Sequence, residues 1–158
     1  MRPSILKSLN PEIIIEMIEM AYRFEEWDKM LDAAGILYSY AQCVYEERQY
    51  HKAKKLPVPL LGTARPLVYY FGFSHLMQGI AFQKQEKYGE ARETIYRYAE
   101  LGWMEDLGLE GLAIAEEFRG LARANLIWWR FCPEKQNFWR SIPGSCRIIQ
   151  RSCCQVSV

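Results

Sequence analysis

This chain of 158 residues has only two histidines, and several of its carboxylates stand in pairs of sequence neighbours. Neither histidine, His51 or His75, has a cysteine or carboxylate at the spacing of zinc ligands. Adjacent glutamates occur at 25–26, 46–47 and 116–117, but neighbouring helical positions point about 100° apart, so each pair predicts a solvated helix face. The sequence contains no phosphate-binding glycine loop and no nucleophile motif. We therefore expect a non-enzymatic protein with no cofactor and no metal site.

Cysteine and tryptophan concentrate in the last 32 residues. Four of the five cysteines lie there, at positions 132, 146, 153 and 154, and only Cys43 precedes them. Residues 127–158 have no sustained helical or strand period and a single acidic side chain. This pattern favours a shift of reading frame near Leu126, with a genuine short basic tail as the alternative. We expect a folded domain over 1–126 and an irregular basic tail over 127–158.

Charge divides the chain at the same place. Residues 1–126 hold 15 basic and 18 acidic side chains, a net charge of −3, whereas residues 127–158 hold 5 and 1, a net charge of +4. Specific DNA binding needs several phosphate contacts, so we expect none from this chain alone. With no run of about 18 apolar residues and no secretion signal, the sequence predicts a cytoplasmic protein that does not enter a membrane. The basic run from His51 to Lys55 is typical of a solvated helix end, with phosphate contact as the alternative.

Apolar periodicity and capping signals predict an all-α domain of about five helices. Asn10 followed by Pro11 is a typical helix start. Prolines 57 and 59 place a loop over 56–64. The expected helices cover 11–24, about 25–55, 66–84, 88–101 and about 106–130, with Gly102 as the C-cap of the fourth.

The segment HLMQGIAFQKQEKYGEARETIYRYAEL, residues 75–101, reads as two helices joined by a tight turn. Glycine within a helix costs about 1 kcal/mol relative to alanine, and is tolerated where another backbone must come close. Gly79 in the first helix and Ala91 in the second mark such a contact. This spacing resembles the tetratricopeptide repeat, a helix pair of about 34 residues that stacks into arrays. The resemblance implies antiparallel helix pairs.

Residues 65–126 resemble a group of bacterial transcriptional regulators from spore-forming Gram-positive species, in which a helix-turn-helix precedes a tetratricopeptide-like array. The long helix expected from residue 25 also fits this group, whereas residues 1–24 are too short for a DNA-binding domain. The resemblance implies the sensing and scaffold part of such a regulator, binding a peptide or protein. A free-standing interaction adaptor and a small helical enzyme fragment are the alternatives.

The resemblance also implies where a peptide would bind, because the first helix of each pair forms the concave wall of such arrays. Matching the chain to the motif directs five residues toward that wall: Phe73, Leu76, Ile80, Gln83 and Lys84. The aromatic run 69–73 favours a helix buried on all sides, with one or two of its rings in the groove as the alternative.

An array of two and a half helix pairs leaves its last helix without cover. That helix carries apolar side chains on adjoining rows, at Leu112, Ala115, Phe118, Leu121 and Ala122. Monomers rarely expose more than a few hundred Å² of apolar surface in one patch. We therefore expect self-association through Leu112, Phe118 and Leu121, with a homo-oligomer as one outcome.

Overall fold

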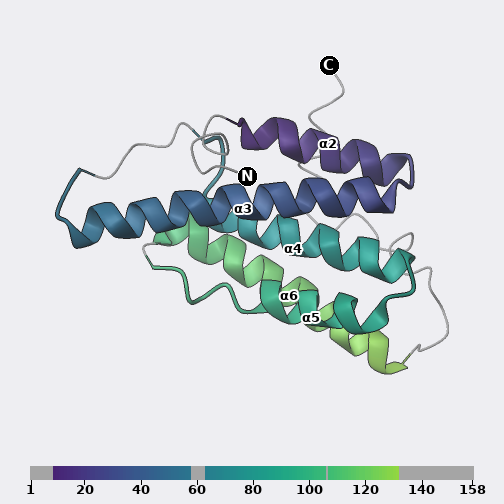
Figure 1. Cartoon of the computed structure of the whole chain (residues 1–158). Coiled ribbons are helices and arrows are strands. Elements are labelled where there is room, and N and C mark those ends of the chain that lie inside the picture. The colour runs from purple at the N-terminus through teal and green to yellow at the C-terminus, as the bar shows by residue number, and fades with distance from the viewer. Residues whose placement is uncertain (1–8, 58–62, 106, 132–158) are drawn as a thin grey trace, which may run out of the picture.

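The chain forms a bundle of α-helices in the computed structural model (Figure 1). The structure describes residues 9–57, 63–105 and 107–131. Within these ranges it contains no strand and five helices: α2 (Pro11–Arg23), α3 (Trp27–Ala53), α4 (Leu67–Lys84), α5 (Tyr88–Ala99) and α6 (Gly108–Phe131). The all-α class and the expected number of helices are confirmed. The tail expected over 127–158 lies outside the described residues beyond the end of α6.

The first helix begins where the sequence predicts. The backbone of Asn10 is extended, and its Oδ1 accepts a hydrogen bond of 3.0 Å from the amide of Glu12. Pro11 follows at the first helical position, where an amide would have no partner within the helix. The capping signal read from the sequence is therefore confirmed.

Two turns of the same geometry form the helical hairpins α2/α3 and α4/α5. In each turn a glutamate takes the left-handed conformation, Glu25 at φ 58° and Glu86 at φ 61°. In the first turn the amide of Glu26 donates to the carbonyl of Ala21 at 2.8 Å, and the second turn repeats this bond at the same length. This is the Schellman pattern that ends helices, here without its usual glycine.

The fourth expected helix ends earlier than predicted, and Gly102 is not its C-cap. The helix α5 stops at Ala99, with Glu100 in the cap position at φ −115°. Leu101 and Met104 are buried directly afterwards. The chain leaves the helix axis because these two side chains enter the core. Their burial anchors the connection between α5 and α6 to the bundle.

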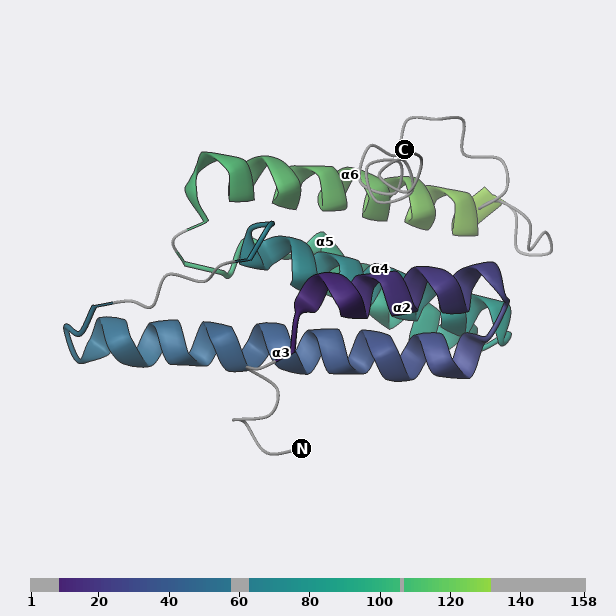
Figure 2. The ribbon, with the colours of Figure 1, turned by 90° about the horizontal axis from the view of Figure 1, so that it is seen from above.

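Helix α4 is the centre of the fold. It packs against α3, α5 and α6, and Figure 2 shows α3 on one side of it and α6 on the other. Fourteen of its eighteen residues are buried. A helix that is apolar on all sides is expected to be enclosed, and the interpretation of the aromatic run 69–73 as core is confirmed.

Two glycines of α4 let neighbouring helices approach its backbone. A Cβ atom at Gly79 would lie 2.8 Å from Oγ1 of Thr94 and 3.7 Å from the carbonyl oxygen of Ala91, both on α5. A Cβ atom at Gly72 would overlap the ring of Phe118 on α6. The close approach predicted between Gly79 and Ala91 is confirmed, and a second one exists at Gly72 that the sequence did not reveal.

Candidate functional site

The five residues expected on a concave wall do not share one open surface. Phe73, Leu76 and Ile80 are each at most 3% exposed and belong to the hydrophobic core. Gln83 and Lys84 are half-buried near the end of α4, where Nζ of Lys84 lies 5.8 Å from the ring centroid of Trp27. The first three are enclosed because α4 has neighbours on three sides. A ligand would reach them only if a neighbouring helix moved away.

The face of α6 expected to self-associate is largely used within the chain. Phe118 is fully buried against α4, and Ala115 and Ala122 are buried beside it. Leu121 is half-buried, and Leu112 is 53% exposed. Of the three residues named for self-association, Leu112 alone is well exposed.

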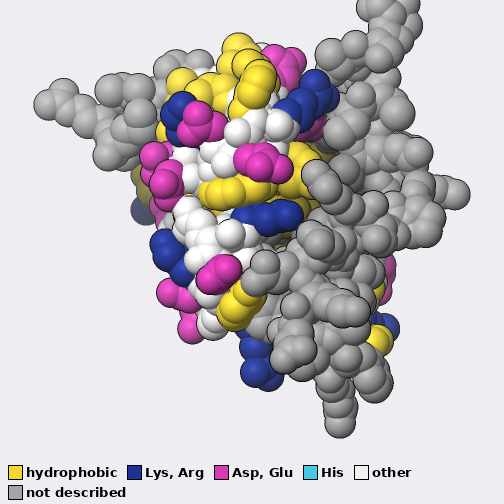
Figure 3. Space-filling view, turned by 90° about the vertical axis from the view of Figure 1, so that its right-hand side faces the viewer, with side chains coloured by type: hydrophobic (Ala, Val, Ile, Leu, Met, Phe, Trp, Pro, Cys, Tyr) yellow, Lys and Arg dark blue, Asp and Glu magenta, His cyan; other side chains and the backbone are white. Residues whose placement is uncertain are grey.

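Helix α2 instead presents an apolar face to solvent. Its inner face buries Ile14, Ile15, Ile18 and Ala21. Its outer face and its C-cap residue carry a row of large hydrophobic side chains that are 53–73% exposed, here called the α2 stripe: Ile13, Met17, Met20 and Phe24. In Figure 3, which looks onto the end of the molecule where α2 ends, hydrophobic side chains gather at the top of the face, over α2.

Sequence reasoning missed the α2 stripe although its signal was present. The run IIIEMIEMAY is apolar at every position except its two glutamates. Such a run supplies two apolar faces at helical spacing, and one neighbouring helix covers only one of them. Positions 14, 18 and 21 follow the spacing of the inner face, and positions 13, 17, 20 and 24 follow that of the outer face.

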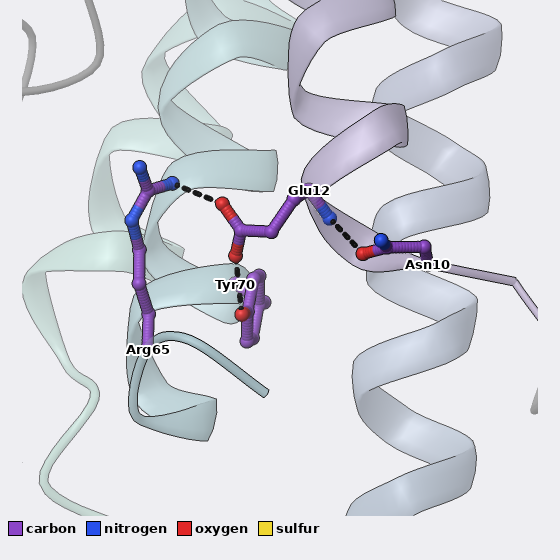
Figure 4. A network of polar contacts seen from close by, with 4 residues as sticks. All are labelled: Asn10, Glu12, Arg65 and Tyr70. Carbon is purple, nitrogen blue, oxygen red and sulfur yellow. Dashed lines mark hydrogen bonds and ion pairs between the residues drawn. The ribbon is translucent and has the colours of Figure 1, made fainter. Parts of the chain in front are cut away.

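A polar network ties the start of α2 to the start of α4 (Figure 4). The hydroxyl of Tyr70 donates to Oε1 of Glu12 at 2.7 Å, and Nη1 of Arg65 forms an ion pair with Oε2 of Glu12 at 3.1 Å. The Arg65 guanidinium also lies 4.7 Å from the ring centroid of Tyr69. Burial raises the pKa of Tyr70, and donation to Glu12 raises it further. Tyr70 therefore stays protonated as a donor, and the network joins two helices.

An aromatic cavity of about 440 Å³ opens between α3, α4 and the end of α5. It is lined by Tyr38, Phe71, His75, Tyr96, Arg97, Glu100, Leu101 and Trp103. Trp103 and Tyr96 are about half exposed. His75 lies within, with its ring centroid 4.9 Å from that of Tyr38. The cavity offers ring faces together with one cation and one carboxylate.

Burial lowers the pKa of His75 below its ordinary value of 6.5. A contact of 3.2 Å between Nδ1 and Oε1 of Gln78 acts in the opposite direction, and the charge of Arg97 lowers the pKa again. The imidazole is therefore neutral at pH 7. A neutral ring packed against Tyr38 is part of the wall of the aromatic cavity.

A second, basic cavity of about 290 Å³ lies between α3, the start of α4 and the connection from α5 to α6. Its charged lining residues are Arg48, Lys52, Arg65 and Glu105. The rings of Tyr45, which lines the basic cavity, and Trp103, which lines the aromatic one, pack edge to face with centroids 5.2 Å apart. The linings of the two cavities therefore meet at this ring pair.

The described part of the chain contains neither a metal-ligand cluster nor a membrane-spanning helix. No group of three or more histidine, cysteine, aspartate or glutamate side chains there could hold a metal ion. The side chain of Cys43 is half-buried. Among the same residues, no helix has the length and apolar character needed to cross a membrane.

Comparison of the chain with protein-family models, with curated proteins and with solved structures gives no significant match. The geometry of the described residues gives three candidate surfaces, namely the α2 stripe, the aromatic cavity and the basic cavity.

Proposed function

We propose that the chain is a non-enzymatic protein-binding module whose partner docks on the α2 stripe. The observation that carries this proposal is the row of four large hydrophobic side chains, each more than half exposed. Their spacing of four, three and four residues follows one face of a helix. Contiguous exposed apolar surface of this kind marks interaction sites on soluble proteins.

The composition of the α2 stripe favours a protein partner over a small ligand. It is a convex row along a helix, whereas small molecules bind in concave sites. Two of its four residues, Met17 and Met20, have flexible side chains that adapt to a partner's surface. Glu16 and Arg23 are exposed on the same helix, and such polar residues suit the rim of an interface.

We further propose that this module is the sensing and scaffold part of a bacterial transcriptional regulator. The support is the resemblance of residues 65–126 to regulators in which a helix-turn-helix precedes the helical array. In that arrangement α2 is the first helix of the array, and its outer face would meet the DNA-binding part. A free-standing adaptor is the second candidate, because the α2 stripe would serve any protein with a matching apolar face.

Site-specific photo-crosslinking in the host cell tests the proposal. A photoreactive phenylalanine analogue replaces Met17 in the α2 stripe or, as the control, Leu109, which is 90% exposed at the start of α6. We expect one discrete adduct from position 17, lost when Met20→Glu is added, and none from position 109. Equal crosslinking from both positions, or none from position 17, would contradict the proposal. A helix-turn-helix encoded upstream in the same open reading frame would favour the regulator, and its absence the adaptor.

A further inference from the structure

We propose that the basic cavity binds a small oxyanion, namely a carboxylate or phosphate group. The cavity has a volume of about 290 Å³, which is near the lower end of the range of small-molecule sites, about 300–1,000 Å³. Its walls come from three separate parts of the chain, so its lining converges from several directions.

One helix face supplies most of the polar groups. Tyr45, Arg48, Gln49 and Lys52 of α3 all line the cavity. Their spacing of three, one and three residues places them on one side of the helix. Arg65 faces them from the segment before α4, and Glu105 lies on the connection from α5 to α6.

Cations outnumber carboxylates in this lining by three to one. Nζ of Lys52 donates to Oε2 of Glu105 at 2.9 Å. Arg65 pairs with Glu12 of α2, which does not line the cavity. Among the described residues, even when both carboxylates are counted, one positive charge is left in excess, that of Arg48.

Arg48 carries a buried donor without a partner. Its Nε is shielded from solvent and has no hydrogen-bond partner among the described residues. An unpaired buried donor of a charged group is costly. An oxyanion would satisfy it, because the guanidinium presents its N–H groups in a planar fork that matches carboxylate and phosphate oxygens.

This site is independent of the proposed protein-binding function. None of the four α2 stripe residues lines the basic cavity. Loss of anion binding would therefore leave the α2 stripe intact, and loss of partner binding would leave the cavity intact.

The test is an NMR titration of the full chain at constant ionic strength and chloride concentration. Inorganic phosphate and succinate are the two probes, added separately to about 50 mM, well above the millimolar dissociation constant of a weak site. The reporters are the Nε–H signal of Arg48 and the backbone amides of Val68 and Glu105, residues that line the cavity. Arg48→Gln removes the guanidinium, Arg48→Lys keeps its charge, and Arg123→Gln is the control on the exposed side of α6.

We expect saturable shifts with at least one probe. Hydrogen bonds to charged groups correspond to about a tenfold or larger change in affinity, so Arg48→Gln should weaken binding at least tenfold, as read from the two amides. Arg48→Lys should weaken it less, and Arg123→Gln should change it less than twofold. Saturation by phosphate alone, by succinate alone or by both assigns the ligand class. Non-saturable shifts with both probes, or equal weakening in Arg48→Gln and Arg123→Gln, would overturn the proposal. If Arg48→Gln does not fold, the comparison of Arg48→Lys with Arg123→Gln decides.

Discussion

The imidazole of His75 is packed against Tyr38 in the wall of the aromatic cavity. Its folded-state pKa is lowered, so the unfolded chain takes up a proton near pH 6.5 and the folded chain does so only at lower pH. Between those two values the unfolded state binds more protons. The free energy of unfolding should therefore fall as the pH falls below about 6.5, by at most about 1.4 kcal/mol per pH unit from this one group.

Urea unfolding of the chain at pH 7.5 and at pH 5.5 measures this dependence. In His75→Gln the difference in the free energy of unfolding between the two pH values should shrink, because the variant lacks the imidazole. An unchanged difference in His75→Gln would show that other groups cause the pH dependence.

The residues that sequence alone placed correctly have local reasons for their positions. Asn10 caps a helix that begins at the next residue, and Gly79 lies on a helix that turns back directly into its partner. The surroundings of His75 were not predictable, because its neighbours Tyr38 and Arg97 come from two other helices. The same holds for Arg48 and Arg65, which meet at the basic cavity only in the folded chain.

At the scale of elements, the contact between α4 and α6 depends on a missing side chain. A Cβ atom at Gly72 would overlap the ring of Phe118, which is fully buried. Gly72→Ala should therefore lower the free energy of unfolding by about 1–3 kcal/mol, as overpacking does. The control is Gly120→Ala within α6, where a Cβ atom would meet nothing within 4 Å. Gly120→Ala should raise the free energy of unfolding by up to about 1 kcal/mol, because alanine has a higher helix propensity than glycine. Thermal unfolding with the opposite order of the two variants would contradict the packing described.

The hairpin turns give a second prediction at this scale. Glu86 has φ 61°, a conformation that glycine adopts without strain. Glu86→Gly should stabilise the chain by up to about 1 kcal/mol, because it removes the left-handed penalty at the helix end. Glu90→Gly, in the first turn of α5, should destabilise it by about the same amount. Chemical denaturation of both variants measures these differences, and a destabilised Glu86→Gly would mean that the side chain matters more than the backbone.

The helices themselves were largely predictable, since capping residues, prolines and apolar spacing act locally. The ends of the helices were less predictable. Helix α5 stops at Ala99 because Leu101 and Met104 enter the core, and no local sequence signal indicates this burial. The neighbour of each helix face was not predictable either. Phe118 was expected outside and lies inside against Gly72, while the outer face of α2 remains open.

At the scale of the whole molecule, α3, α5 and α6 enclose α4, so the candidate surfaces lie around this central helix. The residues expected in a groove, Phe73, Leu76 and Ile80, hold the bundle together. The α2 stripe lies at α2, whereas both cavities open between α3, α4 and residues at or after the end of α5. One small domain thus carries an exposed apolar row and two recesses.

The most direct test of this account is the dissociation constant of the purified chain for the protein crosslinked from position 17, measured by sedimentation. Met17→Glu buries a charge in the centre of the proposed interface, so it should weaken binding at least about tenfold. Leu109→Glu, which introduces the same charge at the start of α6, should change it less than about twofold, as expected outside an interface. Equal affinities for the parent chain and Met17→Glu would contradict the central claim that this protein binds its partner through the α2 stripe.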